Sequence, residues 1–148
     1  MHLVKNRHLI PALVLSFLGF IDASYLTIVH YRDALPNCSI LKGCDIVTTS
    51  ALSTIGGIPI ALFGALFYLA LSFFAILIIT HPHKTWVQLF SLTAYLGFLV
   101  SLFLFLLQII VLRAICQYCI GSEIISFLIY LFAINMVRHV KKVERQKS

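Results

Sequence analysis

Apolar residues fill four long stretches of the sequence, and polar residues are concentrated in the connections between them. The stretches are residues 9–30, 58–80, 87–112 and 118–137. Each has about the 20 mainly apolar residues that an α-helix needs to cross the hydrocarbon core of a bilayer. The pattern predicts an all-α membrane protein, a bundle of four transmembrane helices that forms a single domain over residues 1–148.

The longest connection, residues 31–57, is the one long polar loop of the chain. Its Thr/Ser-rich segment, residues 48–54, is mildly amphipathic and ends at Gly56 and Gly57. We expect a short helix there that lies at the membrane interface. Pro59 fits the first turn of the following helix, where its missing N–H leaves no hydrogen bond unmade.

Composition agrees with a membrane protein. Hydrophobic residues make up 61% of the chain and the mean hydropathy is +1.02, whereas soluble domains contain about 45–50% apolar residues. The first apolar stretch follows a short basic segment, as in a signal peptide. A signal peptide, however, has an apolar core of only about 7–15 residues and a small-residue cleavage site. We therefore predict a retained membrane helix.

The net charge of +6 comes from basic residues that lie beside the apolar stretches. This placement is typical of topology signals and does not favour a nucleic-acid partner. Arg32, Lys42 and Arg113 fall on one side of the predicted membrane. The other side carries Lys5, Arg7, Lys84, Arg138, Lys141, Lys142, Arg145 and Lys147.

By the positive-inside rule, the more basic side is cytoplasmic, so both termini are predicted to lie in the cytoplasm. The basic tail after residue 137 is expected to be a solvated end. The two cysteine-bearing connections then face outward. In the inner membrane of a bacterium this is the periplasm, where disulfides persist.

The four cysteines form two pairs, Cys38 with Cys44 in the polar loop and Cys116 with Cys119 at the start of the last apolar stretch. From the residues alone, three interpretations are open: structural disulfides or packed thiols, a four-thiolate zinc site, and a redox relay. Zinc is disfavoured because the sequence has no second CxxC and the first lies where a membrane helix begins. Four cysteines allow three fully paired connectivities.

A redox relay accounts for more of the pattern. Cys119 falls in the first turn of a helix, where the helix dipole and unpaired N–H groups lower the pKa of a thiol. This position also borders the bilayer, where a quinone ring can approach. Cys38 and Cys44 can reach a soluble partner on one side and the CxxC pair on the other. Two dithiol pairs in series can pass electrons through mixed disulfides.

Further motifs accompany the cysteines. They are Ser50 six residues after Cys44, Gly57-Ile58-Pro59, Phe63-Gly64-Ala65-Leu66-Phe67-Tyr68, and Asp22-Ala23-Ser24-Tyr25-Leu26-Thr27. Together with Cys116-Gln117-Tyr118-Cys119, they resemble the bacterial branch of the vitamin K epoxide reductase family over nearly the whole chain. The resemblance implies a four-helix bundle around a quinone, ubiquinone or menaquinone, with disulfide-forming activity. Many bacterial members carry a fused thioredoxin-like domain, and none follows Ser148, so a separate thioredoxin-like partner is implied.

The resemblance also implies roles for individual residues. Cys119 is implied as the thiol nearest the quinone and Cys116 as its exchange partner. Cys44 is implied to shuttle electrons to Cys116, and Cys38 to meet the protein substrate. The implied quinone pocket contains Ser50, Phe63, Phe67 and Tyr68.

Two positions depart from the vertebrate members of the family. Ile60 and Glu123 stand where the vertebrate enzymes have an asparagine and a tyrosine that contact vitamin K, so epoxide reduction of the vertebrate kind is not predicted. Glu123 lies one turn beyond Cys119. It either delivers a proton to the reduced quinone or is an interfacial carboxyl group that reaches water. For Asp22 and Gln108 we expect structural hydrogen bonds.

These observations predict a quinone-dependent thiol oxidase that takes electrons from a periplasmic thioredoxin-like protein. The alternative is a structural or assembly membrane protein whose disulfides brace its loops. The other four-helix family of quinone-linked disulfide oxidases has its CxxC in the first outer loop, the reverse of the order here. A metal or solute carrier needs polar groups through the bilayer centre, and few are present.

Overall fold

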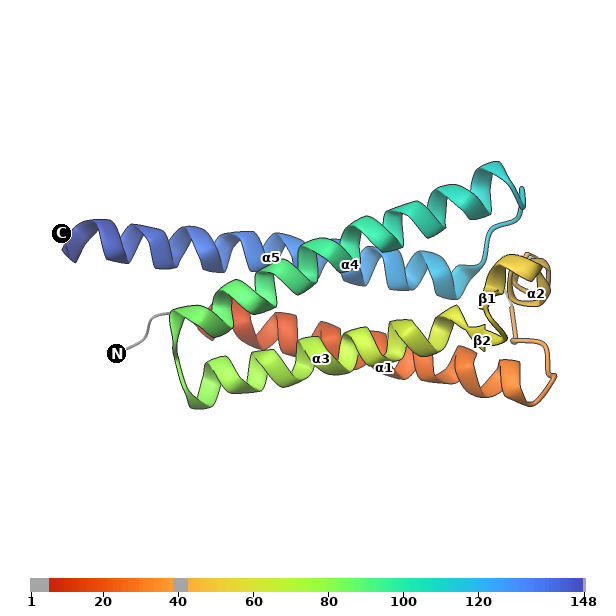
Figure 1. Cartoon of the computed structure of the whole chain (residues 1–148), viewed down its shortest axis with the longest axis horizontal. Helices are drawn as coiled ribbons and strands as arrows, with labels where there is room; N and C mark the ends of the chain where they lie inside the picture. The colour runs from red at the N-terminus through yellow and green to blue at the C-terminus, as the bar shows by residue number, and fades with distance from the viewer. Residues whose placement is uncertain (1–5, 39–42, 148) are drawn as a thin grey trace.

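The computed structural model describes residues 6–38 and 43–147, and within them four long helices form the bundle (Figure 1). The helices are α1 (Asn6–Tyr31), α3 (Ile60–Thr80), α4 (Lys84–Ile110) and α5 (Gln117–Lys147). Each contains a segment long and apolar enough to cross a membrane. The predicted all-α, four-helix membrane protein is confirmed, and the chain is a multi-pass membrane protein.

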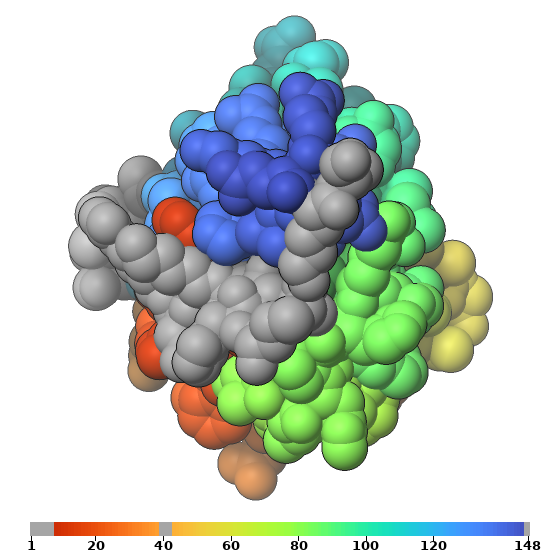
Figure 2. All heavy atoms as spheres, turned by 90° about the vertical axis from the view of Figure 1, so that its left-hand side faces the viewer, coloured from red at the N-terminus to blue at the C-terminus, as the bar shows by residue number. Residues whose placement is uncertain are grey.

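Two helix boundaries differ from the prediction at the end of the bundle where the termini lie. α4 begins at Lys84, before residue 87, because the ring Nδ1 of His83 accepts a hydrogen bond from the Thr85 N–H at 3.3 Å and caps the helix. α5 continues well beyond residue 137, and the basic side chains of Arg138, Lys141, Lys142 and Arg145 on it are exposed, as expected of a solvated end. Val140 is buried in the core, and Lys84 forms an ion pair with Glu144 at 2.7 Å. Figure 2 shows this end, with the last turns of α5 beside the start of α4.

The outer loop is more structured than one interfacial helix. Its helix, α2 (Cys44–Thr49), begins before the predicted segment and ends where Ser50 becomes extended, and a 3-10 turn, η1 (Ala51–Ser53), follows. Strands β1 (Thr54–Ile55) and β2 (Ile58–Pro59) then pair as a small antiparallel hairpin. Gly56 and Gly57 form its turn with φ of 59° and 84°, a left-handed conformation that glycine adopts without strain. Pro59 ends β2 and occupies the N-cap position of α3, one residue before the first turn in which it was expected.

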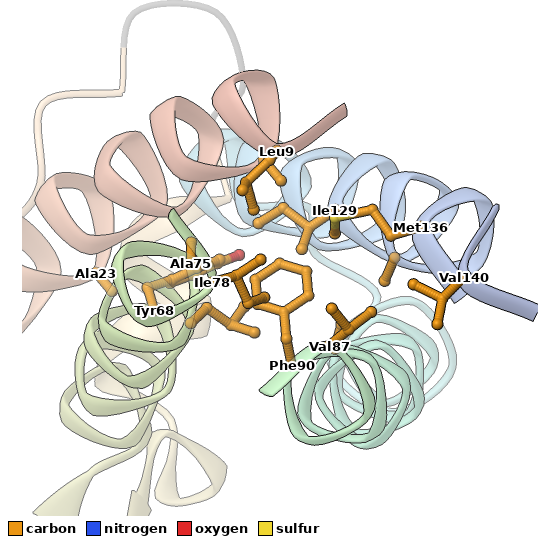
Figure 3. Packing of buried hydrophobic residues seen from close by; sticks show 14 of the residues in the cluster. Leu9, Ala23, Tyr68, Ala75, Ile78, Val87, Phe90, Ile129, Met136 and Val140 are labelled. Atoms are coloured by element: carbon orange, nitrogen blue, oxygen red, sulfur yellow. The ribbon is translucent and has the colours of Figure 1, made fainter. Parts of the chain in front are cut away.

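The buried core occupies the half of the bundle nearer the termini. In Figure 3, Phe90 of α4 lies between Ile78 of α3 and Ile129 of α5, and Phe90 is completely buried. α1 and α3 approach closely at Gly19, where an added Cβ would lie 2.5 Å from the Tyr68 ring. Small residues allow such contacts between membrane helices. Large apolar side chains elsewhere are exposed, as expected of surfaces that face lipid. The other end of the bundle carries the loop and the cysteines.

Candidate thiol redox site

The CxxC pair is positioned by a tight reversal between α4 and α5. Arg113 adopts a left-handed conformation with φ of 50°, and the Ala114 N–H bonds back to the Gln108 carbonyl at 3.3 Å. Cys116 immediately precedes α5 and its carbonyl accepts the Ile120 N–H at 3.1 Å. Cys119 therefore lies in the first turn of the helix, as the sequence predicts. Cys116 is completely buried, and both residues are free thiols.

The thiolate of this pair is favoured at Cys116. A hydrogen bond from the Cys119 thiol, helped by the backbone N–H groups of Cys119 and Tyr118, lowers the pKa of Cys116 to about 7 against the opposing effect of burial. The sequence analysis predicted the lowered pKa at Cys119. This prediction is wrong, because the thiol with the lowered pKa is Cys116. The physical reason is that the Cys116 sulfur accepts the hydrogen bond from the Cys119 thiol and, as the residue just before the helix, also faces the unpaired N–H groups of the first turn.

Cys38 and Cys44 are joined in a disulfide, with their Cα atoms 6.3 Å apart. Of the three possible pairings, the structure therefore contains the one within the loop. Cys44 is buried at the start of α2. The protein thus combines an oxidised outer pair with a reduced inner pair. In the described part of the chain, no three His, Cys, Asp or Glu side chains are grouped to hold a metal ion.

The loop touches the CxxC segment at Gly43, the residue before Cys44. A Cβ atom added to Gly43 would lie 2.7 Å from the Ile115 nitrogen and 2.8 Å from the Ile115 oxygen. The backbone of residue 43 therefore packs directly on the backbone of the residue before Cys116. Only glycine permits this approach, because any side chain would overlap main-chain atoms.

A second contact joins the loop to the CxxC segment at Asn37, the residue before Cys38. The Asn37 carbonyl accepts hydrogen bonds from the Tyr118 hydroxyl at 3.0 Å and from Gln117 Nε2 at 3.5 Å. The Asn37 N–H donates to the hydroxyl of Tyr25 at 3.5 Å, and the Tyr25 and Tyr118 rings lie 5.2 Å apart. Sequence reasoning missed these residues, although two of them stand between the cysteines of the motif.

A cavity of about 240 Å³ lies between the helices next to this segment, and Cys119 lines it. Ser50, Phe67, Tyr68 and Glu123 also line it, together with residues of α1 and α4. Phe63 does not: its side chain is 48% exposed on α3. Phe63 precedes Gly64, a cavity residue, and a step of one residue turns the side chain by about 100° around the helix. The sequence-based placement of Phe63 in the pocket is therefore not supported by the structure.

Several polar groups in the cavity wall already have partners. The Tyr68 hydroxyl donates to the Ser122 carbonyl at 2.8 Å, the Ser50 hydroxyl donates to the Val47 carbonyl at 2.9 Å, and the Ser101 hydroxyl donates to the Glu123 carboxylate. Asp22 and Gln108 also line the cavity. Within residues 6–38 and 43–147, Asp22 Oδ2 and both amide atoms of Gln108 are buried without a hydrogen bond. The expected structural hydrogen bonds are therefore absent at Gln108.

A protein-family model described as "Vitamin K epoxide reductase family" matches residues 10–134. The chain belongs to the vitamin K epoxide reductase family. The matched range contains both cysteine pairs and the whole cavity. Comparison with individual curated proteins gave no match. As a member of the vitamin K epoxide reductase family, the chain is assigned to an oxidoreductase family whose chemistry involves disulfides and quinones.

Proposed function

We propose that this protein is a quinone-dependent thiol oxidase that supports disulfide bond formation. Electrons pass from a separate periplasmic thioredoxin-like protein through the two cysteine pairs to a membrane quinone. The observation that carries the proposal is the position of the CxxC pair. Cys119 lines the cavity, whereas the residues on either side of Cys116 contact the loop that bears the second pair.

The first exchange takes place at the outer disulfide. A thiolate of the reduced partner attacks Cys38, and the Cys38–Cys44 bond breaks. The second partner thiol resolves the mixed disulfide, so the partner is oxidised and Cys38 and Cys44 become thiols. Cys44 is buried whereas Cys38 is only half-buried, which supports Cys38 as the residue that meets the partner.

The second exchange joins the two pairs. The Cys44 thiolate attacks Cys116 in an inner disulfide and releases Cys119. Cys38 then attacks Cys44 and releases Cys116, so the outer disulfide closes again and the inner pair is reduced. The oxidised outer pair and reduced inner pair seen in the structure correspond to the product of this exchange. The contact between Gly43 and Ile115 provides the proximity that thiol exchange requires.

The cavity fits a quinone ring because its wall is largely apolar and one thiol of the CxxC lines it. The wall also holds a buried amide, that of Gln108, which has no hydrogen-bond partner among residues 6–38 and 43–147. When bound, ubiquinone or menaquinone accepts the two electrons and two protons that the inner dithiol loses as it becomes a disulfide. Phe67 and Tyr68 form part of the wall on α3, and Ser50 lies on the loop side. Glu123, held by Ser101, is a group in the wall that can transfer a proton.

The proposed location is the inner membrane of a bacterium, with both termini in the cytoplasm and the cysteines toward the periplasm. Figure 1 places both termini at one end of the bundle and α2, β1 and β2 at the other. Basic residues at the end with the termini, including Lys84, Arg138 and Lys141, support this orientation by the positive-inside rule. We further propose that residues 1–148 form a single domain.

The test uses purified protein, a reduced thioredoxin-like protein and a short-chain quinone, with quinone reduction followed by absorbance. We expect turnover in the wild type that requires the thiol substrate and is lost in Cys119→Ala. A partner whose resolving cysteine is replaced by alanine can attack Cys38 but cannot be released as a disulfide, so it is expected to accumulate as a mixed disulfide with Cys38 while Cys44 is left as a thiol. Absence of both turnover and trapping would instead favour a membrane protein whose disulfides only brace its loops.

A further inference from the structure

Gln108 is a buried amide without a hydrogen-bond partner in the part of the chain that the structure describes. It lies near the end of α4, its side chain is 3% exposed, and neither Oε1 nor Nε2 forms a hydrogen bond with any described residue. Most buried polar side-chain atoms in proteins are hydrogen-bonded, because an unpaired one loses its bonds to water without replacement. A ligand in the adjoining cavity that both accepts and donates would satisfy the two unpaired groups of this amide.

The unpaired amide lies at the cavity. Gly97, Ser101 and Gln108 all line it, and their spacing places them on one face of α4. On α5, the spacing of Cys119, Glu123 and Ser126 likewise defines one face, and all three line the same cavity. The Ser126 hydroxyl is also buried without a hydrogen bond among the described residues.

Along the bundle axis, Gln108 lies within about 4 Å of the level of Cys119. The hydrogen bond between Ser101 and Glu123 fixes the register of the antiparallel helices α4 and α5. Gln108 follows Ser101 by seven residues, which places it about 10 Å nearer the loop end. Cys119 precedes Glu123 by four residues, which places it about 6 Å nearer the same end. A flat ring that occupies the cavity beside Cys119 therefore lies within reach of Gln108.

The backbone of Gln108 is tied to the segment that carries the CxxC pair. Its carbonyl accepts the Ala114 N–H, and Ala114 is itself buried next to Gly43 of the loop. The backbone that carries the amide is thus held in place by this hydrogen bond. Binding groups that are fixed in advance lose less entropy when the ligand arrives.

We infer that Gln108 is the residue that binds the ring oxygen of the quinone, an inference that rests on the proposed function. Nε2 donates a hydrogen bond to the carbonyl oxygen of the quinone, and Oε1 accepts one from the hydroxyl group of the quinol. An amide carries both a donor and an acceptor and does not titrate, so it binds both redox forms of the ligand. Gln108 is therefore a binding residue that holds the ring while the inner thiols are oxidised.

The experiment compares Gln108→Met and Gln108→Leu with Gln88→Leu, the same chemical change at an exposed glutamine of the same helix. We measure the steady-state constants for a short-chain quinone and the increase in melting temperature that the quinone causes. In both Gln108 variants we expect KM for the quinone to rise about tenfold with kcat nearly unchanged, and the thermal shift to shrink. Gln88→Leu is expected to behave as the wild type.

The melting temperature measured without quinone distinguishes a quinone-binding role of Gln108 from a structural one. Removal of an unpaired buried amide is expected to leave the melting temperature unchanged or to raise it, whereas loss of a structural hydrogen bond lowers it. A lower melting temperature in both Gln108 variants would overturn the inference, as would an unchanged KM and thermal shift. If the wild type reduces quinone normally, either of these outcomes in the Gln108 variants overturns the role of Gln108 and leaves the proposed function standing. Failure of the wild type to reduce any quinone would overturn the proposed function itself.

Discussion

Tyr118 donates a hydrogen bond to the backbone carbonyl of Asn37 across 3.0 Å, and so links the residue before Cys119 to the residue before Cys38. The interaction spans the two cysteine pairs, which are far apart in the sequence. Because the acceptor is a main-chain carbonyl, the bond fixes the path of the loop and not only one side chain. The link holds the outer disulfide over the CxxC segment.

Loss of this bond is expected to slow exchange between the pairs. Tyr118→Phe keeps the ring against Tyr25 but removes the hydroxyl donor, and a hydrogen bond contributes about 1 kcal/mol, so we expect a roughly fivefold lower rate of exchange between the outer and inner pairs. The rate is measured by rapid quenching and thiol alkylation. Tyr95→Phe, on α4 and remote from the cysteines, is the matched control. Equal rates in the two variants would show that the Tyr118 bond does not position the loop.

Gly43→Ala tests the backbone contact. The φ of −122° at Gly43 suits alanine, so the only cost is overlap of the new Cβ with main-chain atoms of Ile115. The loop must move, and displacement by about 1 Å lowers a reaction rate by about a hundredfold. We expect exchange between Cys44 and Cys116 to slow by about that factor.

The control for this substitution is Gly121→Ala, because a Cβ there meets nothing within 4 Å. Gly121 lies within α5, so alanine is expected to stabilise the protein by about 0.5–1 kcal/mol without slowing exchange. Exchange is followed by mass spectrometry of alkylated protein. A Gly43→Ala protein with the wild-type exchange rate would mean that the contact is dispensable.

The reduced inner pair should titrate near neutral pH. With the pKa of Cys116 lowered to about 7, its thiolate is populated above that pH and is lost as the pH falls through it. Oxidation of the inner pair needs a thiolate, so single-turnover quinone reduction is expected to rise with pH and level off above about 7. Ultraviolet thiolate absorbance gives the midpoint.

The Cys119→Ala variant removes the thiol that donates to Cys116. We expect the midpoint to move up toward the ordinary cysteine value of 9.0. A wild-type midpoint already near that value would contradict the assignment of the thiolate to Cys116.

The ion pair between Lys84 and Glu144 should contribute little to stability. Both side chains are about half exposed, at 47% and 48%, and water screens such pairs. Glu144→Gln is expected to lower the free energy of unfolding by less than about 1 kcal/mol. Phe90→Ala, in the core, is expected to lower it by about 3–5 kcal/mol. Both are measured by denaturation in detergent, and similar losses would contradict this ranking.

The four helices could be predicted because bilayer thickness sets the length of each apolar run. The end of α5 could not, because hydropathy does not register a polar helix that continues outside the membrane and packs through Val140. The start of α2 depends on the disulfide and on the contact at Gly43, neither of which is a local sequence signal.

The CxxC pair was identified because two-residue spacing at a helix start is a recognisable pattern, and the remaining two cysteines lie together in the polar loop. Gln108 was misjudged because a sequence shows that a polar residue lies in the membrane, but not whether a partner lies opposite. The position of the lowered pKa was misjudged for a similar reason. It depends on which sulfur accepts the hydrogen bond, and three-dimensional geometry decides this.

At the contact between Gly43 and Ile115, residue 115 contributes main-chain atoms, and residue 43 can approach them only because glycine has no side chain. The contact therefore tolerates substitution of residue 115 but not of residue 43. Residue 115 presents only its backbone and its own side chain is 41% exposed, so natural variation there leaves the junction intact. At residue 43 every replacement introduces a carbon atom into the contact. Among homologues that share this contact, we expect glycine to be conserved at position 43 and the residue type at position 115 to vary.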